Sequence, residues 1–332
     1  MNRSKLLIIV LLVIVIVLGG SGSWRLFGRL TGFSYANADK YTAGNTEISD
    51  PVENLDIDWT SGRINIEYHT GSGVTVSETS PKPLAEEHKL RWWLDGKTLR
   101  IRYIKDGITL TFGLDKTLTV SLPRETTLKK AEISATSADI SADNLLADEI
   151  VFDTTSGDLN VSTSAKKLTA GSTSGDITIQ QRLDLDSVCV SSTSGFIGLT
   201  LGNAKNVDVG STSGAIRVTA SGSIGNIRLD STSGSITPDL QDVEKADFSS
   251  TSGDITATLV SFTDLNVDAT SGDVSLKLTE TTGFTLDLDA RPKKLRTTLP
   301  MAVKGEGKYV FGDGSARLRV STTSGDIRIE KH

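Results

Sequence analysis

The sequence predicts an all-β protein whose main part is a parallel β-solenoid with about 19–20 residues per coil. Three observations support this prediction. A five-residue motif recurs at a nearly constant spacing, apolar residues alternate with polar ones around each copy, and small residues gather where the motif turns. The chain should therefore consist largely of one supersecondary unit stacked on itself.

The recurring motif is Thr-Ser-Gly-Asp-Ile or a close variant of it. Its serine returns every 18 to 20 residues through the second half of the chain. Two outlying copies lie at residues 60–64 and 323–327. A fixed period of this length is typical of repeat architectures. The serines of the regular array are Ser137, Ser156, Ser174, Ser194, Ser213, Ser233, Ser252 and Ser271.

Alternate residues around each copy are apolar, which indicates half-buried strands. In one copy Val207 and Val209 share a side with Ser211 and Ser213, and Ile216 resumes that side after the turn. Each coil should thus contain about two strands and one sharp corner. The serine of the motif is expected to point inward.

The corner of each repeat is expected to be a structural site. Small inward serines would fit where the coil narrows, and a glycine would supply a positive φ that costs other residues more. Ala138 replaces this glycine in the first coil, so that turn should differ. The expected corner residues are Ser156, Gly157, Ser174, Gly175, Ser194, Gly195, Ser213, Gly214, Ser233, Gly234, Ser252, Gly253, Ser271, Gly272, Ser324 and Gly325.

A single coil cannot fold alone. It buries four to six apolar side chains, each worth about 1.5–3 kcal/mol, against an ordering cost of about 1–2 kcal/mol per residue. Stacked coils pair their strands at about 4.7–4.9 Å and merge their apolar columns into one core. A continuous solenoid is therefore expected from about Leu128 onward.

Composition narrows the class of partner. The 332 residues carry a net charge of −6, which argues against a nucleic-acid partner. The only cysteine, Cys189, rules out a disulfide within the chain. By the strand alternation it should face outward as a small surface residue; a reactive or intermolecular thiol is the alternative.

The N-terminus predicts a membrane anchor. Residues 6–18 are aliphatic without a break, and 6–23 carry no charge. We interpret residues 1–24 as a single N-terminal anchor helix that meets the membrane through residues 6–23, with Trp24 at the interface. A cleaved signal peptide is the alternative. Both place the bulk of the chain on the extracytoplasmic side, after a flexible tether at residues 25–45.

Two further regions follow the tether. Residues 46–123 are rich in strand signals but do not follow the period, which predicts an N-terminal β cap over the open edge of the solenoid. Residues 124–332 should form the repeat domain. Its last strands, around Leu318 and Val320, are expected to seal the far end as a closing coil.

Acidic residues after the corner glycines are the only candidates for a metal site. Solenoids that bind calcium place carboxylates at coil corners, and Ca²⁺ takes six to eight oxygens. The candidates are Asp158, Asp176, Asp254 and Asp273, but Phe196, Ala215 and Ser235 interrupt their column. We therefore favour carboxylates that accept backbone N–H groups in tight turns, and expect neither metal nor cofactor.

No arrangement of residues predicts catalysis. The three histidines, His69, His88 and His332, are far apart in the sequence. The acids on the strands lack the paired arrangement of a glycoside hydrolase. The cap hairpin carries basic and aromatic residues, of which Trp92 has the parity of a core residue. Trp93 has the opposite parity, so that glycan stacking, membrane contact or ordinary packing are open for it.

The repeated Thr-Ser-Gly-Asp-Ile, Leu122-Pro123 before the array and the closing segment 318–329 resemble the bacterial putative-adhesin domain family, long classed as a domain of unknown function. The resemblance covers roughly residues 52–331. It implies an exported or membrane-tethered β-solenoid, found in some members beside cell-envelope-stress signalling systems, and it supplies no catalytic residues.

We therefore expect a non-enzymatic cell-surface adhesin or envelope-binding scaffold. Its partners would be cell-wall polymers, envelope proteins or other copies of the chain. The alternative is an accessory regulator of a cell-envelope-stress signalling system, acting through contacts near the membrane.

Overall fold

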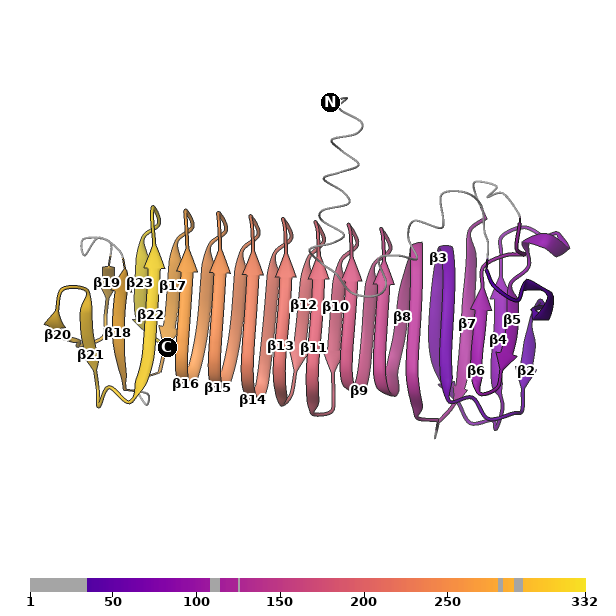
Figure 1. Cartoon of the computed structure of the whole chain (residues 1–332), viewed down its shortest axis with the longest axis horizontal. Coiled ribbons are helices and arrows are strands. Elements are labelled where there is room, and N and C mark those ends of the chain that lie inside the picture. Colours follow the sequence, from indigo (N-terminus) through magenta and orange to yellow (C-terminus); the bar gives the residue numbers. More distant parts are fainter. Residues whose placement is uncertain (1–34, 108–113, 125, 280–282, 290–294) are drawn as a thin grey trace, which may run out of the picture.

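The computed structural model is a long stack of coils, with the strands running across its long axis (Figure 1). It describes residues 35–107, 114–124, 126–279, 283–289 and 295–332. The expected anchor at residues 1–24 and the first ten residues of the expected tether lie outside this part. Within the described residues, no helix has the length and apolar character needed to cross a membrane.

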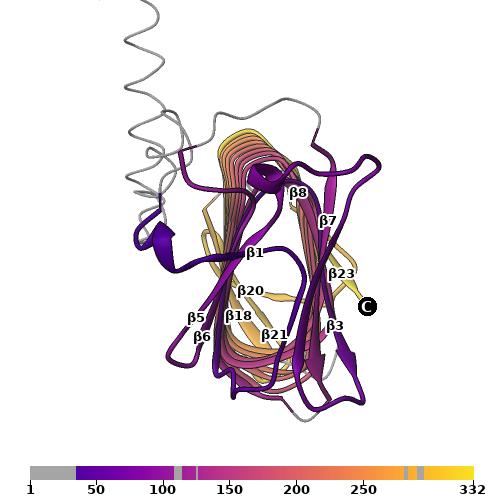
Figure 2. The same ribbon diagram turned by 90° about the vertical axis from the view of Figure 1, so that its right-hand side faces the viewer.

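Each coil has two walls, and the end view shows them enclosing a narrow interior (Figure 2). The wall after the motif is here called the post-corner face, and the wall before it the pre-corner face. Longer strands bend and contribute to both walls. The strands of the array are β8 (Leu128–Thr154), β9 (Leu159–Ser172), β10 (Ile177–Gln181), β11 (Leu185–Ser192), β12 (Ile197–Leu201), β13 (Ala204–Ser211), β14 (Ile216–Ser231), β15 (Ile236–Ser250), β16 (Ile255–Ala269) and β17 (Val274–Leu278).

The coils stack in parallel and in register, as the repeat predicts. On the post-corner face Ile197 pairs with Ile177 of the preceding coil and Ile216 of the following one. On the pre-corner face Val190 pairs in the same way with Ala170 and Val209. Equivalent residues therefore lie directly over one another, and all described strands belong to one continuous sheet.

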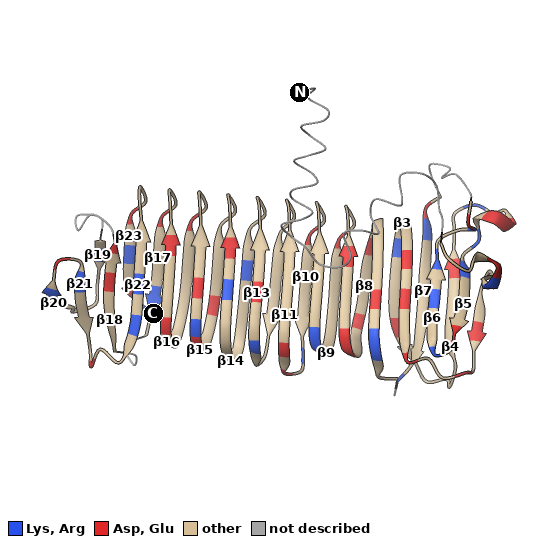
Figure 3. Ribbon diagram, viewed as in Figure 1, with Lys and Arg blue, Asp and Glu red and all other residues tan. Residues whose placement is uncertain are grey.

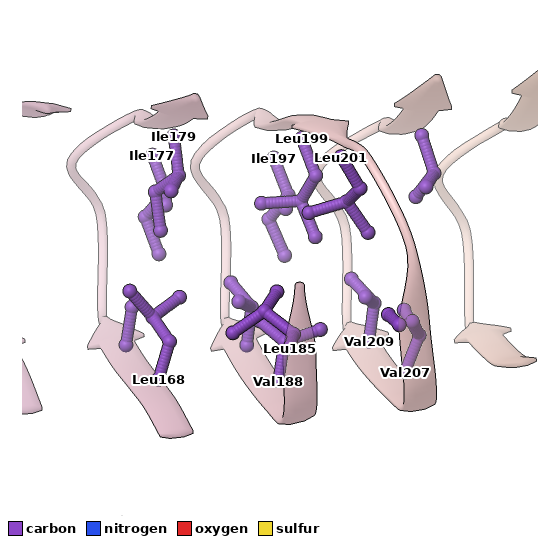
Figure 4. Packing of buried hydrophobic residues seen from close by; sticks show 14 of the residues in the cluster. Leu168, Ile177, Ile179, Leu185, Val188, Ile197, Leu199, Leu201, Val207 and Val209 are labelled. Carbon is purple, nitrogen blue, oxygen red and sulfur yellow. The ribbon is translucent and has the colours of Figure 1, made fainter. Parts of the chain in front are cut away.

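The core lies between the two walls. Leu168, Val188 and Val207 point inward from the pre-corner face, toward Ile177 and Ile197 of the opposite face (Figure 4). All five side chains are at most 2% exposed. The alternation of apolar and polar residues thus places one apolar column of each wall against a column of the other.

The motif serines do not point inward, and that prediction is wrong. Ser213 is exposed together with Thr212, while Ser211 before them and Gly214 after them are buried. Two exposed residues lie between the inward Ser211 and Gly214, so the strict alternation breaks before the motif serine and not after it. The same exposure holds for Ser156, Ser174, Ser194, Ser233, Ser252, Ser271 and Ser324.

The corner glycines are needed for close stacking, and the expectation of a positive φ is also wrong. Among the motif glycines, only Gly62 of the outlying copy has a positive φ, of 93°. A Cβ on any other would lie 1.8–2.1 Å from the carbonyl oxygen of the equivalent residue one coil below. This column comprises Gly157, Gly175, Gly195, Gly214, Gly234, Gly253, Gly272 and Gly325.

The N-terminal end contains solenoid coils, so the array begins earlier than expected. β3 (Asn54–His69) forms a full coil whose two halves pair in parallel with β8. On its other side β3 pairs with β6 (Thr98–Arg102) and β7 (Lys116–Pro123). The outermost coil is therefore built by a later segment than the coil beside it.

Antiparallel strands cover this outermost coil. β4 (Val74–Thr79) pairs with β7, and β5 (Arg91–Asp95) forms the expected hairpin with β6. β2 (Thr46–Ile48) adds to β4 and β1 (Thr42–Ala43) adds to β5. Residues 35–45, predicted to belong to a free tether, thus include a strand and contact the cap.

The C-terminal end also departs from the order of the sequence. The last coil, β22 (Ala316–Thr322) and β23 (Ile327–Lys331), lies between β16–β17 and the coil of β18 (Phe284–Asp289) and β19 (Leu295–Thr297). β21 (Lys308–Phe311) and β20 (Ala302–Gly305) then add antiparallel strands beyond β18. The segment expected to seal the end is therefore internal, and strands β18 to β21 lie outside it.

Gly214→Ala should destabilise the solenoid, because its methyl group would meet the Gly195 carbonyl oxygen at 1.9 Å. We expect a loss of about 1–3 kcal/mol or more, as for other overpacked sites. Gly210→Ala on the same coil is the control, since a Cβ there meets nothing within 4 Å. Thermal unfolding of both variants tests this, and equal melting temperatures would contradict the role of the glycine column.

Candidate functional site

The corners are hydrogen-bonded structural elements. At four of them the buried hydroxyl three residues before the glycine accepts the glycine N–H, with N–O distances of 2.9–3.1 Å. These hydroxyls belong to Thr154, Ser192, Ser250 and Thr322. The equivalent hydroxyls of Ser172, Ser211 and Ser231 are buried and have no hydrogen-bond partner within the described part of the chain. The corners therefore fix the turn with side chains that the sequence places in a column.

The acidic column links one coil to the next. Asp158 accepts the backbone N–H of Asp176 through Oδ1 at 2.9 Å, and Asp254 accepts that of Asp273 at 2.9 Å. Asp176 and Asp273 repeat the contact at 2.8 Å with the residue above each of them. The sequence predicted carboxylates bound to N–H groups within a turn, whereas these N–H groups belong to the neighbouring coil.

The four metal candidates are thus engaged with backbone donors. Each carboxylate lies one coil from its neighbour rather than around a common centre. Among the residues that the structure describes, no group of three or more His, Cys, Asp or Glu side chains has the arrangement of a metal site. In this structure the acidic column therefore links stacked coils through hydrogen bonds.

The lateral faces carry charges of both signs, spread along the strands (Figure 3). Several form ion pairs between neighbouring coils, such as Lys166 with Asp148 and Lys205 with Asp186. Cys189 lies exposed on the pre-corner face, on the side that the alternation predicts. The faces are therefore mixed in charge, with cations and anions paired between coils.

Lys116 is a buried cation inside the N-terminal cap. It pairs in register with Gly62 and occupies the corner-glycine column of the outermost coil, where no further coil restricts its side chain. Its ammonium group lies 2.8 Å from a Glu78 carboxylate oxygen and over the rings of Trp59 and Tyr103, at 4.8 and 4.3 Å from their centroids. Its side chain is fully buried.

Burial lowers the pKa of Lys116 to about 8, while the Glu78 carboxylate opposes this shift. The cation also donates to the carbonyl oxygens of His88 and Tyr103. It therefore joins three separate cap segments around one charge. The burial of Lys116 was not predicted from the sequence. It alternates in step with the apolar residues Leu118, Val120 and Leu122, and this pattern could have indicated an inward side chain.

The N-terminal segment of residues 35–48, here called the clasp, wraps around the cap hairpin. The Tyr35 hydroxyl donates to the Ile104 carbonyl oxygen at 3.1 Å. Tyr41 packs edge to face between Tyr35 and Trp93, with ring centroids 4.8 and 5.7 Å apart. Lys40 lies 4.9 Å from the centroid of the Trp93 ring. Trp93 is thus occupied by the chain itself, which assigns it to packing.

Arginines beneath the clasp are neutralised by acids of the cap. Arg100 pairs with Asp56 and Asp95, and Arg102 pairs with Asp56 at 3.0 Å. Their guanidinium groups lie about 6 Å from the rings of Trp93 and Tyr41. The basic hairpin predicted from the sequence is consequently a folded network between clasp and cap. Trp92 packs against the core, as its parity predicts.

The chain belongs to the family described as Toastrack DUF4097, whose profile matches residues 52–264 and 164–330. This confirms the family resemblance of the repeat motif. A comparison with curated proteins finds no match.

Solved structures that match this chain include two described as putative adhesins. The one from Bacteroides fragilis is 14% identical, with a TM-score of 0.42 over 67% of this chain and 97% of that chain. The one from Parabacteroides merdae is 15% identical, with a TM-score of 0.41 over 87% and 96%. A third, described as a putative lipid binding protein from Parabacteroides distasonis, is 15% identical, with a TM-score of 0.38 over 87% and 96%. These similarities are too distant to transfer a function.

The buried lysine should make stability depend on pH. Its pKa of about 8 in the folded protein lies below the value of about 10.4 in an unfolded chain. Between these values the unfolded chain binds more protons, so this group makes the free energy of unfolding rise with pH. From pH 8 to 9.5 the rise should reach about 1.5 kcal/mol.

Urea unfolding at pH 8 and 9.5 measures this rise. The double variant Lys116→Met/Glu78→Gln removes both charges together and should lose the rise, while all other titrating groups stay the same. An identical pH dependence in the two proteins would contradict a neutral, buried Lys116 above pH 8.

Trp93→Ala should loosen the clasp, because it removes the ring against which Tyr41 and Lys40 pack. An aromatic pair of this kind contributes about 0.5–1.5 kcal/mol beyond its buried area. Hydrogen exchange should become faster in residues 35–48 and stay unchanged in the array. Val303→Ala, at a 71% exposed side chain near the other end, is the control; unaltered exchange in the clasp would refute the role of Trp93.

Proposed function

We propose that this protein is a non-enzymatic β-solenoid held on the extracytoplasmic side of the cell membrane, where its lateral faces bind cell-wall polymers or envelope proteins. The proposal rests on the continuous hydrogen bonding between strands from the cap to β19. It makes each wall of the solenoid a long, rigid surface. Surfaces of this kind suit extended partners that contact many coils at once.

The location of the protein is proposed from its N-terminus. The uncharged segment 6–23 has the length and flanks of a signal anchor. Only residues 24–34 separate this segment from Tyr35, which is bound to the cap. Eleven extended residues reach at most about 40 Å. The cap would therefore stay close to the membrane while the array projects from it.

The absence of enzymatic activity is part of this proposal. The repeat corners use their hydroxyls, glycines and carboxylates in contacts between and within coils. Lys116 and Glu78, the buried ionisable pair of the cap, are covered by aromatic rings. The outward side chains of the two walls are then the residues that we propose to bind a partner.

A role as accessory regulator of an envelope-stress signalling system is the second candidate. The docked clasp favours it, because the clasp lies between the proposed anchor and the cap and could transmit contacts made near the membrane. In this case the important surface would be the cap rather than the lateral faces.

Sedimentation with isolated bacterial cell walls distinguishes the two candidates. Purified protein comprising residues 35–332, the part that contains every described strand, should be retained in the pellet if the faces bind wall polymers. Retention should fall as free wall fragments are added as competitors. No retention, together with an altered stress-reporter signal when the gene is deleted, would reject the binding scaffold and support the regulator.

A further inference from the structure

The aspartates of the acidic column show which chemical group binds the backbone N–H at each corner. In five places a carboxylate oxygen accepts the backbone N–H that follows the corner glycine one coil above, at 2.8–3.1 Å. The acceptors are Asp139, Asp158, Asp176, Asp254 and Asp273. A carboxylate is therefore the group that this backbone position binds.

Three consecutive coils lack this carboxylate. Phe196, Ala215 and Ser235 stand in the column instead of aspartate. Within the described part of the chain, the N–H groups above them, those of Ala215, Ser235 and Asp254, have no side-chain or backbone acceptor. The stack thus presents a row of three open backbone donors, spaced by one coil of about 4.8 Å.

The residues of this row are half-buried (Phe196 and Ala215) or exposed (Ser235). The Phe196 ring leans along its own strand, so that a Cβ on Gly198 would lie 2.8 Å from a ring carbon. Among the described residues of the array between Leu128 and Leu278, Phe196 is the only aromatic residue that is not buried.

A cation lies beside the row. Arg217 pairs in register with Gly198, next to the Phe196 ring, and its side chain is exposed. It forms no ion pair with any residue that the structure describes. The position therefore combines open N–H donors, an unpaired guanidinium group and an aromatic ring, within a column that is acidic on both sides.

We propose that this row, Phe196–Ala215–Ser235 with Arg217, is a binding site for a carboxylate-bearing polysaccharide. Sugar carboxylates take the places that aspartate carboxylates take in the other coils, and Arg217 pairs with one of them. A sugar ring packs its C–H face against Phe196. This site deepens the proposed function and rests on it, because it identifies one class of wall polymer for the post-corner face.

The acidic flanks limit what can bind. Asp176 and Asp254 lie at the two ends of the row, so an isolated anion gains little there. A polymer that places several groups on adjacent donors binds more tightly, since each further contact is intramolecular. The expected ligand is therefore a polymer rather than a free carboxylate.

The double variant Ala215→Asp/Ser235→Asp tests the site without weakening the fold. It restores two carboxylates to the column, where they should accept the N–H groups of Ser235 and Asp254 and close the row. Its melting temperature should rise by about 2–4 °C. Its affinity for polygalacturonate, measured by calorimetry on residues 35–332, should fall about tenfold or more relative to the wild type.

Three controls separate the contributions. Thr256→Asp adds a charge to the same face outside the row and should bind like the wild type. Dextran tests whether charge is needed, and polyglutamate tests whether the sugar is needed; both should bind about tenfold more weakly than polygalacturonate. Wild-type protein that binds neither polygalacturonate nor its fragments, or a double variant with unchanged affinity, overturns the site.

The outcomes also distinguish this site from the broader function. If wild type and double variant are both retained on cell walls, the scaffold function stands and the site is rejected. If polyglutamate binds as tightly as polygalacturonate, the assignment to a polysaccharide is rejected. Loss of cell-wall retention in the double variant alone supports both proposals.

Discussion

Hydrogen bonding of one coil directly to the next is the constraint on which this structure depends. The ladder continues through the corners, where Ser213 donates its N–H to Thr193 of the preceding coil at 2.9 Å. At eight corners the buried position is glycine, and a Cβ there would lie 1.8–2.1 Å from a carbonyl oxygen of the coil below; Ala138 is the exception within the stack. The glycine and aspartate columns serve this contact between coils, while the hydroxyl caps fix the turn within a coil. All three recur with the period of the stack.

The same constraint explains both ends of the molecule. A stack of parallel strands would end in open edges that invite other chains. Here the first and last full coils of the sequence, β3 and β22–β23, are each held between two others. Later or earlier segments form the outer coils and add antiparallel strands. The C-terminal coil is thus paired on both sides, and at the other end Lys116 stands in the column position of the outermost coil.

The residue at a surface position can vary wherever its side chain takes no part in the stacking of coils. The array tolerates Phe196, Ala215 and Ser235 because an aspartate at these places adds a contact but is not required for the backbone ladder. In the clasp, by contrast, the aromatic side chains pack on the cap and are not available to a partner. Open donors on a rigid wall and a cap tied to the N-terminus together favour a molecule that presents a surface.

The sequence by itself determined the solenoid, its period, the parity of the strands and the columns of glycine and aspartate, because stacked coils repeat the same local demands. It also indicated Trp92 as core and the hairpin of β5 and β6. The tertiary structure decided the orientation of the motif serines, since the alternation breaks before them, with two exposed residues between Ser211 and Gly214. It decided the order of the terminal coils, the burial of Lys116 and the docking of Tyr41 on Trp93. These features depend on which segments, distant in the sequence, pack against each other. The repeat period carries no information about such contacts.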